Sequence, residues 1–250
     1  MIVLEAGINH FGNLLEAKKI LKFFLNSHHK YLSFMIQTEK FNQKYKKKTN
    51  FELPKTFYLE AIKLAKKRRK YIGLAVCDLN SYKKYSDINF NFYKLLGVAI
   101  NNKDLIGQLK IKKKTVFISL SKGSNTNINK CINFFGSKKF LKLIYTNMSY
   151  DANDLDLNRI NYLKKRYKLS VGYGHHFDKD LPVHLSKIFG ADFLFIYIKH
   201  FNKKKKSYPD DKHAFFTKDL FKLENDIKIT EVLIKKKKKI STEIKIDEKI

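Results

Sequence analysis

The chain has 250 residues, of which 44% are hydrophobic, and its formal net charge is +29. This length suits one large domain, and an α/β barrel is a common outcome at this size. The two cysteines, Cys77 and Cys131, have neither zinc-ligand nor disulfide-framework spacing, and no apolar run reaches the length of a membrane span. We therefore expect a cytoplasmic protein that has no membrane segment.

The strong positive charge invites a nucleic-acid-binding interpretation, because clustered lysines and arginines displace counterions from phosphates. Arginine, the preferred residue for bidentate contacts to phosphate or guanine, occurs only at positions 68, 69, 159 and 166. Lys, Asn, Ile, Phe and Tyr are abundant, and their codons are rich in A and T. The base composition of the gene therefore accounts for much of the charge, and nucleic-acid binding is kept only as a weaker alternative.

Apolar runs alternate with helix-length segments along the whole chain. The strands that we expect are 1–4, 31–37, 71–76, 92–99, 115–119, 140–145, 169–173 and 193–198. The expected helices are 13–24, 55–69, a short one near 82–85, 103–109, 128–135, 155–167, 180–191 and 218–233. The runs lack the period-2 alternation of a half-exposed sheet, so the pattern predicts a (β/α)8 TIM barrel. An open doubly wound sheet is the structural alternative.

Polar and imidazole-bearing residues follow several of these strands. Glu5, Asn9 and His10 follow the first strand, while His176 and His200 follow the seventh and eighth. Parallel strands end on the same side of a barrel, and closure places the first strand beside the eighth. Two neighbouring imidazoles then predict a metal site at His176 and His200, with polar residues that merely cap strand ends as the alternative.

The residues around these strand ends resemble the sialic acid synthase family, which includes the N-acetylneuraminate, pseudaminic acid and legionaminic acid synthases. The resemblance begins with the segment Glu5-Ala6-Gly7-Ile8-Asn9-His10-Phe11-Gly12, followed by Ala17-Lys18-Lys19. The further matching motifs are Gln37-Thr38, Tyr93-Lys94 with Asn102, 116–119, Thr146-Asn147 with Tyr150, Gly172-Tyr173 with His176, 190–192, 199–201 and 209–213. The order and spacing of these motifs, from Ile2 to Leu233, are more specific than any one of them.

The resemblance implies a TIM-barrel transferase that condenses phosphoenolpyruvate with an N-acetylated amino sugar for surface glycan biosynthesis. It also implies a divalent metal, Mn²⁺ or Mg²⁺, which His176 and His200 would hold and which would polarise the sugar aldehyde. Glu5 and His10 are the expected catalytic residues. The expected substrate-binding residues are Asn9, Lys94, Ser119, Asn147, Tyr150 and Lys199.

Several positions depart from the family's pattern. The replaced positions are Met35 for a lysine, Gly97 and Ala99 for serine and glutamate, Gly174 and His175 for serine and aspartate, and Ile198 for a glutamate. A hydrogen bond to a charged group is worth about 1.5–3 kcal/mol, so these losses are substantial. Either Lys122 or Lys203 rebuilds the phosphoenolpyruvate site, or the barrel is degenerate and binds a sugar or metal without condensing anything.

The expected domain organisation is one synthase-like barrel over 1–234, followed by a charged, disordered tail over 235–250. In the sialic acid synthase family, which this chain resembles, a C-terminal antifreeze-like domain caps the sugar site of the partner subunit in a homodimer. We expect the charged tail in place of that domain.

Overall fold

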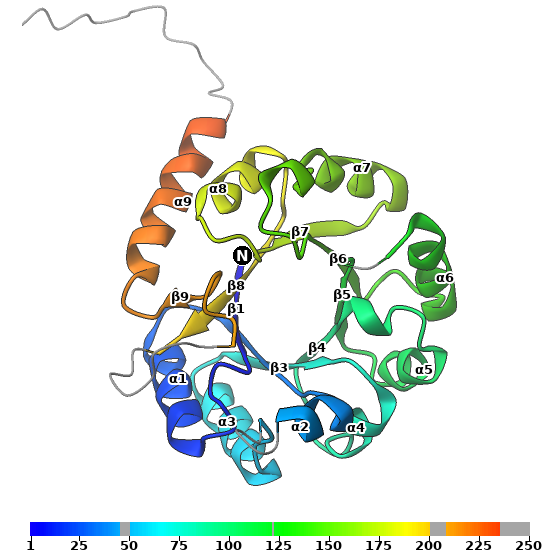
Figure 1. The fold of residues 1–250 in the computed structure, drawn as a ribbon, viewed down its shortest axis with the longest axis vertical. Helices are drawn as coiled ribbons and strands as arrows, with labels where there is room; N and C mark the ends of the chain where they lie inside the picture. Colours follow the sequence, from blue (N-terminus) through cyan, green and yellow to red (C-terminus); the bar gives the residue numbers. More distant parts are fainter. Residues whose placement is uncertain (46–50, 122, 201–208, 236–250) are drawn as a thin grey trace, which may run out of the picture.

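The computed structural model describes residues 1–45, 51–121, 123–200 and 209–235. Its central feature is a closed barrel of parallel strands (Figure 1). The strands are β1 (Ile2–Gly7), β2 (Tyr31–Met35), β3 (Tyr71–Val76), β4 (Phe92–Leu95), β5 (Thr115–Ser119), β6 (Leu141–Thr146), β7 (Ser170–Gly174) and β8 (Leu194–Lys199). Each strand pairs with the next, and β1 also pairs with β8. The predicted TIM barrel is confirmed, and the open sheet is excluded.

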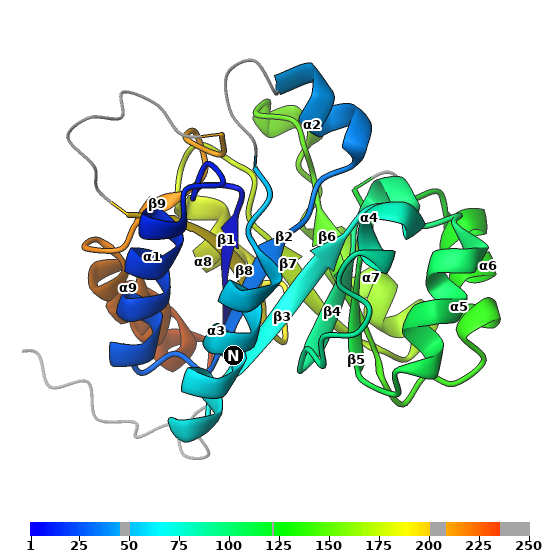
Figure 2. The same ribbon diagram turned by 90° about the horizontal axis from the view of Figure 1, so that it is seen from below.

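Helices surround the barrel and cover the outer faces of its strands (Figure 2). They are α1 (Leu14–Asn26), α3 (Lys55–Lys67), α4 (Leu79–Lys83), α5 (Lys103–Ile111), α6 (Asn125–Phe135), α7 (Asn158–Tyr167), α8 (Leu181–Ile188) and α9 (Leu220–Ile234). α1 illustrates why they form. The side chain of Asn13 accepts hydrogen bonds from the backbone N–H groups of Leu15 and Glu16, and Ala17, Ile20, Leu21 and Phe24 form its buried stripe.

Three local features differ from the sequence-based expectation. The fourth strand ends at Leu95 rather than 99, because Gly97–Ala99 forms a 3₁₀ helix in which Val98 is 62% exposed. An apolar run alone does not distinguish these two structures. The structure also contains α2 (Glu39–Tyr45) and β9 (Phe215–Phe216), which pairs in parallel with the end of β8.

Some expectations fall on residues outside the described ranges. Lys122, Lys203 and, apart from Lys235, the predicted tail are among them. Within the described ranges, no helix combines the length and the apolar composition needed to cross a lipid bilayer.

The barrel interior changes from apolar to polar along its axis. Six large apolar side chains form a cluster inside the barrel: Val3, Phe92, Phe117, Ile144, Phe193 and Phe195. Gly172 leaves room for the Phe193 ring, whose nearest carbon would lie 2.3 Å from a Cβ at that position. Two residues further along β1, β4 and β8, the interior positions are Glu5, Lys94 and Tyr197. These three residues begin the polar C-terminal end of the barrel, which we call the barrel mouth.

Candidate active site

Glu5 and Lys94 form an ion pair at the base of the barrel mouth. Nζ of Lys94 lies 2.5 Å from Oε2 of Glu5, and the two residues are 2% and 0% exposed, respectively. The same Nζ lies 4.9 Å from the ring centroid of Phe195 and 5.3 Å from that of Tyr197. Burial raises the pKa of the Glu5 carboxyl, and the nearby Lys94 charge opposes that rise. Oε1 of Glu5 has no hydrogen-bond partner among the described residues, so it can accept a bond from a ligand.

Two histidines and Tyr197 lie close to this ion pair, and Tyr150 contacts one of the histidines. The ring of His176, which follows β7, is centred 4.4 Å from that of His213 and 4.9 Å from that of Tyr197. The hydroxyl of Tyr150 lies 2.9 Å from Nδ1 of His213. Burial and neighbouring positive charge lower the pKa of His176 well below its usual value and that of His213 to about 4. Both rings are therefore neutral at pH 7, the state in which an imidazole can accept a proton or bind a metal.

Asp210 adds a carboxylate to the barrel mouth. Its Oδ1 lies 3.8 Å from Nε2 of His213. Burial raises the pKa of Asp210 to about 7, and the negative charge of Glu5 adds to the rise. Gly7 permits this close approach, because it has a φ of +52° and a Cβ there would lie 2.7 Å from Oδ2 of Asp210. Asp210 thus has the protonation behaviour of an acid–base catalyst near neutral pH.

Three of the predicted substrate-binding residues hold loops around the mouth. Asn9 accepts a hydrogen bond from the backbone N–H of Asp210 and donates one to the carbonyl of Ile198. Lys199 donates to the carbonyl and the carboxylate of Asp211, at 2.8 and 2.6 Å. Asn147 donates to the carbonyl of Asp154 and accepts from the N–H of Ser149, within the loop after β6. Asn9 and Lys199 thereby position the segment that carries Asp210 and His213.

The remaining predicted residues divide between the mouth and its surroundings. Ser119 is buried at the end of β5 and shares the interior-facing alternation of Phe117. His10 lies in the loop after β1, where its Nδ1 accepts from the N–H of Gly12 and its ring packs 6.1 Å from that of Phe34. Burial lowers the pKa of His10 to about 4. His10 therefore packs within the loop after β1, against Phe34 of β2, which belongs to the core between the barrel and its helices.

The structure separates His200 from His176, contrary to the predicted pair. His176 has the interior-facing alternation of β7, whereas His200 follows Ile196 and Ile198, which pack in the core between the barrel and its helices. His200 lines a pocket with α1 residues, including Lys19 and Phe23, and its Nδ1 lies 3.4 Å from Oγ1 of Thr217. The prediction considered where the two strands end, but not which way successive side chains point.

Two departures from the family's pattern have a visible structural consequence. A Cβ at Gly174 would lie 2.4 Å from Oγ1 of Thr146, so the hydroxyl of Thr146 occupies space that a side chain at 174 would need. Met35 belongs to an apolar cluster with Ala75, Tyr197 and Ala214. The mouth thus keeps a hydroxyl near Gly174, while the side around Met35 has become apolar.

A comparison with models of known protein families assigns the chain to one of them. The model of the NeuB family matches residues 18–239 of the chain. The chain belongs to the NeuB family. This confirms the resemblance to the sialic acid synthases, and it makes the chain a member of a family of sugar-acid synthases that act in carbohydrate biosynthesis.

Known relatives of this NeuB-family chain agree with the assignment. The N,N'-diacetyllegionaminic acid synthase of Campylobacter jejuni is 25% identical over 246 residues, which covers 88% of this chain and 73% of that protein. The crystal structure of an N-acetylneuraminic acid synthetase from Leptospira borgpetersenii, in complex with citrate, has a TM-score of 0.83 at 20% identity. The alignment covers 96% of this chain and 87% of that one. The spore coat polysaccharide biosynthesis protein spsE of Bacillus subtilis has a TM-score of 0.78 at 17% identity, covering 95% and 70% of the two chains. At these identities, the two structures support the TIM-barrel fold.

The sequence did not lead us to predict three residues of the barrel mouth as site residues: Tyr197, Asp210 and His213. Tyr197 was detectable, because it lies two residues after the interior Phe195 on a strand in register with β1. Asp210 and His213 lie between β8 and β9, in a segment without helical or strand periodicity. Their motif was visible in the sequence, but only the folded chain shows that it turns back over Gly7.

Proposed function

We propose that this NeuB-family protein condenses phosphoenolpyruvate with an N-acetylated amino sugar, forming a nine-carbon 2-keto acid and releasing phosphate. The observation that carries the proposal is the buried Glu5–Lys94 pair beneath unpartnered polar atoms of His176, Asp210 and His213 in the described part of the chain. A buried lysine next to groups that can exchange protons near neutral pH suits an anionic substrate whose reaction requires proton transfers.

The proposed reaction makes defined demands on these residues. The methylene carbon of phosphoenolpyruvate bonds to the aldehyde carbon, and the aldehyde oxygen gains a proton. Water adds to the phosphate-bearing carbon, the bond from that carbon to the phosphate oxygen breaks, and the loss of both protons of the water leaves the 2-keto group and inorganic phosphate. Asp210, with a pKa of about 7, can donate the first proton or accept one from the water. Lys94 stabilises negative charge on the substrate, and Oε1 of Glu5 accepts a bond from a sugar hydroxyl. Tyr150 orients the ring of His213.

The side chains of the mouth also suit a divalent metal. His176 and His213 would hold it, since Nδ1 of His176 and Nε2 of His213 are buried without a hydrogen-bond partner in the described ranges. Their rings are centred 4.4 Å apart. Two imidazole ligands favour Mn²⁺ over Mg²⁺, which prefers oxygen ligands. A bound metal would polarise the aldehyde of the sugar.

The positions of the two predicted metal histidines lead to opposite expectations for two alanine variants. His176→Ala is expected to weaken Mn²⁺ binding by about 100-fold or more. Loss of a residue that only hydrogen-bonds to a metal ligand already costs about 10–100-fold in affinity, and this variant removes a ligand itself. His200→Ala, the matched control outside the mouth, is expected to change the affinity by less than about twofold. Isothermal titration calorimetry with Mn²⁺ measures both affinities. Equal losses in the two variants would instead restore the pairing of His176 with His200.

Phosphate release tests the condensation itself. The protein is incubated with Mn²⁺, phosphoenolpyruvate and a panel of N-acetylated amino sugars, and inorganic phosphate is measured against samples that lack sugar. Sugar-dependent release is the expected result. The second candidate function, binding of a sugar or metal without condensation, is favoured by the apolar side of the mouth around Met35. Intact Mn²⁺ binding without release from any sugar would establish that second function.

A further inference from the structure

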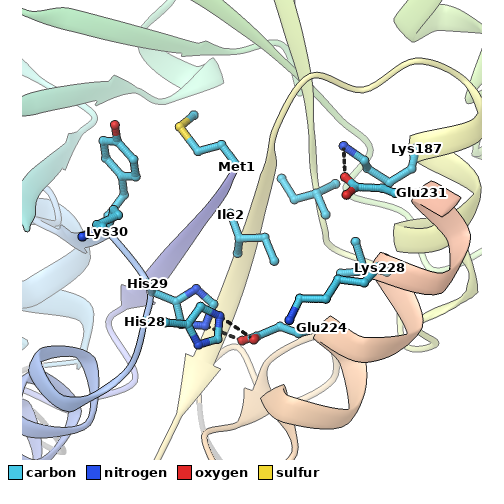
Figure 3. A pocket seen from close by; sticks show the side chains of 12 residues that line it. Met1, Ile2, His28, His29, Lys30, Lys187, Glu224, Lys228 and Glu231 are labelled. Carbon is cyan, nitrogen blue, oxygen red and sulfur yellow. Dashed lines mark ion pairs between the residues drawn. The ribbon is translucent and has the colours of Figure 1, made fainter. Parts of the chain in front are cut away.

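A second group of potential metal ligands lies outside the barrel mouth. His28 and His29 occupy the loop between α1 and β2, and Glu224 reaches them from α9 (Figure 3). They line a pocket of about 490 Å³ together with Met1 and with Ile2, the first residue of β1. This places the group at the N-terminal ends of the strands, whereas active sites of TIM barrels lie at the C-terminal ends. The proposed synthase reaction makes no use of it.

The three side chains converge on a small volume. Nε2 of His28 lies 2.7 Å from Oε2 of Glu224, and Nε2 of His29 contacts Oε1 of the same carboxylate. The two imidazole rings stack with their centroids 4.6 Å apart. Across the described ranges, this is the only set of three His, Cys, Asp or Glu side chains whose ligand atoms all lie within 4.8 Å of one another.

The contacts within this group do not satisfy its buried atoms. The side chains of His29 and Glu224 are only 4% and 5% exposed. Despite the short separations, neither Nε2 of His29 nor Oε2 of Glu224 has a partner in hydrogen-bond geometry in the part of the chain that the structure describes. A nitrogen lone pair and a carboxylate oxygen that face each other repel unless a cation or a proton lies between them.

We propose that His28, His29 and Glu224 bind a transition-metal ion of the Zn²⁺ class, in a site separate from the barrel mouth. Two imidazoles and one carboxylate form an established ligand set for Zn²⁺, which takes a tetrahedral arrangement with the fourth position open to water. The exposed ring of His28 and the adjoining pocket give the ion access from solvent. The site would attach α9 to the loop that precedes β2, and so join the last described helix to the start of the barrel.

The positive charges around the site determine which ions it can hold. Lys70 donates to the carbonyls of Phe24 and Ser27, and Lys187 pairs with Glu231 at 2.8 Å, so both amines have partners other than Glu224. Lys30 and Lys228 line the same pocket. These cations repel any metal, which disfavours ions that depend on charge alone, such as Mg²⁺ and Ca²⁺. Strong imidazole coordination of the Zn²⁺ class overcomes that repulsion.

Zinc and cobalt titrations of the full chain test the site. Chelator-treated protein is titrated with Zn²⁺ against a chromophoric chelator, and with Co²⁺, whose tetrahedral complexes absorb strongly in the visible range. The natural protein is expected to bind one more equivalent of Zn²⁺ than His28→Ala. Zn²⁺ is also expected to raise the Tm of the natural protein by several degrees more than that of His28→Ala. His28 is 66% exposed, so this variant leaves the core intact. His29→Ala and Glu224→Gln are expected to behave alike, with circular dichroism as the check on folding.

Two further variants separate this site from others. His184→Ala removes a histidine that contacts Thr230 outside the group and is expected to retain the extra equivalent. His176→Ala removes a proposed ligand of the barrel mouth and is also expected to retain it, so failure of the proposed function leaves this test intact. Identical Zn²⁺ stoichiometry and Tm shifts in the natural protein and His28→Ala would overturn the proposal. The group would then be only an ion pair between two histidines and a buried glutamate.

Discussion

Replacement of Lys94 by methionine is expected to lower sugar-dependent phosphate release by about 100- to 1,000-fold, the cost of removing a preorganised electrostatic group from an active site. It is also expected to destabilise the fold, because Glu5 remains fully buried after its partner is gone. Breaking one side of a buried ion pair costs about 3–5 kcal/mol. Phosphate release and the free energy of unfolding in urea measure the two effects separately.

A double variant distinguishes catalysis from stability. In Glu5→Leu/Lys94→Met, both charges are replaced by apolar groups of similar volume, a change that is often neutral or stabilising in buried pairs. The unfolding free energy is therefore expected to return close to that of the natural protein, while phosphate release stays lost. Recovery of activity in the double variant would contradict the catalytic role of the pair, and full stability in the Lys94→Met single variant would contradict its role in stability.

The destabilisation by Lys94→Met is also expected to depend on pH. Burial raises the pKa of Glu5 above 4.5, and Lys94 partly offsets the rise, so its removal raises that pKa further. A group whose pKa is raised by folding contributes its stability below the unfolded-state pKa and loses it as the pH rises. The variant should therefore approach the stability of the natural protein below about pH 4 and fall behind it above that pH.

The fold was predictable because each barrel strand is buried on both faces. Such strands appear as short apolar runs, and the runs at 71–76 and 115–119 coincide with β3 and β5. The prediction failed where an apolar run had another structure, as at Gly97–Ala99. It also failed at β9, because a run of only two apolar residues does not indicate that they pair with the end of β8.

The candidate active site was predictable only in part. Glu5 and Lys94 were identified as separate residues at strand ends, but their pairing across the barrel depends on which interior layer each occupies. Counting alternate residues from Phe193 would have placed Tyr197 inside and His200 outside the barrel. Asp210 lies outside the strands, so the alternation of strand residues does not predict its position. That position depends on its close approach to Gly7 and on the hydrogen bond from its backbone to Asn9.

Asp210→Asn is expected to lower kcat by about 100- to 10,000-fold and to remove the pH dependence of phosphate release near pH 7. The reason is the environment of this carboxyl, since burial and the charge of Glu5 raise its pKa to about 7. The same shift makes the natural protein lose stability as the pH rises from about 4 to above 7, by about 1.4 kcal/mol for each unit of the shift. Asparagine keeps the neutral form at every pH, so the variant should not show that loss. Rate profiles and urea unfolding between pH 4 and 8.5 test both expectations.

Asp211→Asn is the matched control, because Asp211 is the neighbouring carboxylate but is 42% exposed and pairs with Lys199. Asp211→Asn is expected to keep the change of rate near pH 7, called the limb of the pH–rate profile, although it loosens the loop that Lys199 holds. A limb that persists in Asp210→Asn would transfer the acid–base role to another group of the mouth. His213 and His176 would not suit that limb, since burial keeps both rings neutral down to a pH well below 7. A change of rate near pH 7 that disappears in Asp210→Asn and persists in Asp211→Asn would therefore identify Asp210, because burial and the charge of Glu5 raise its pKa to about 7.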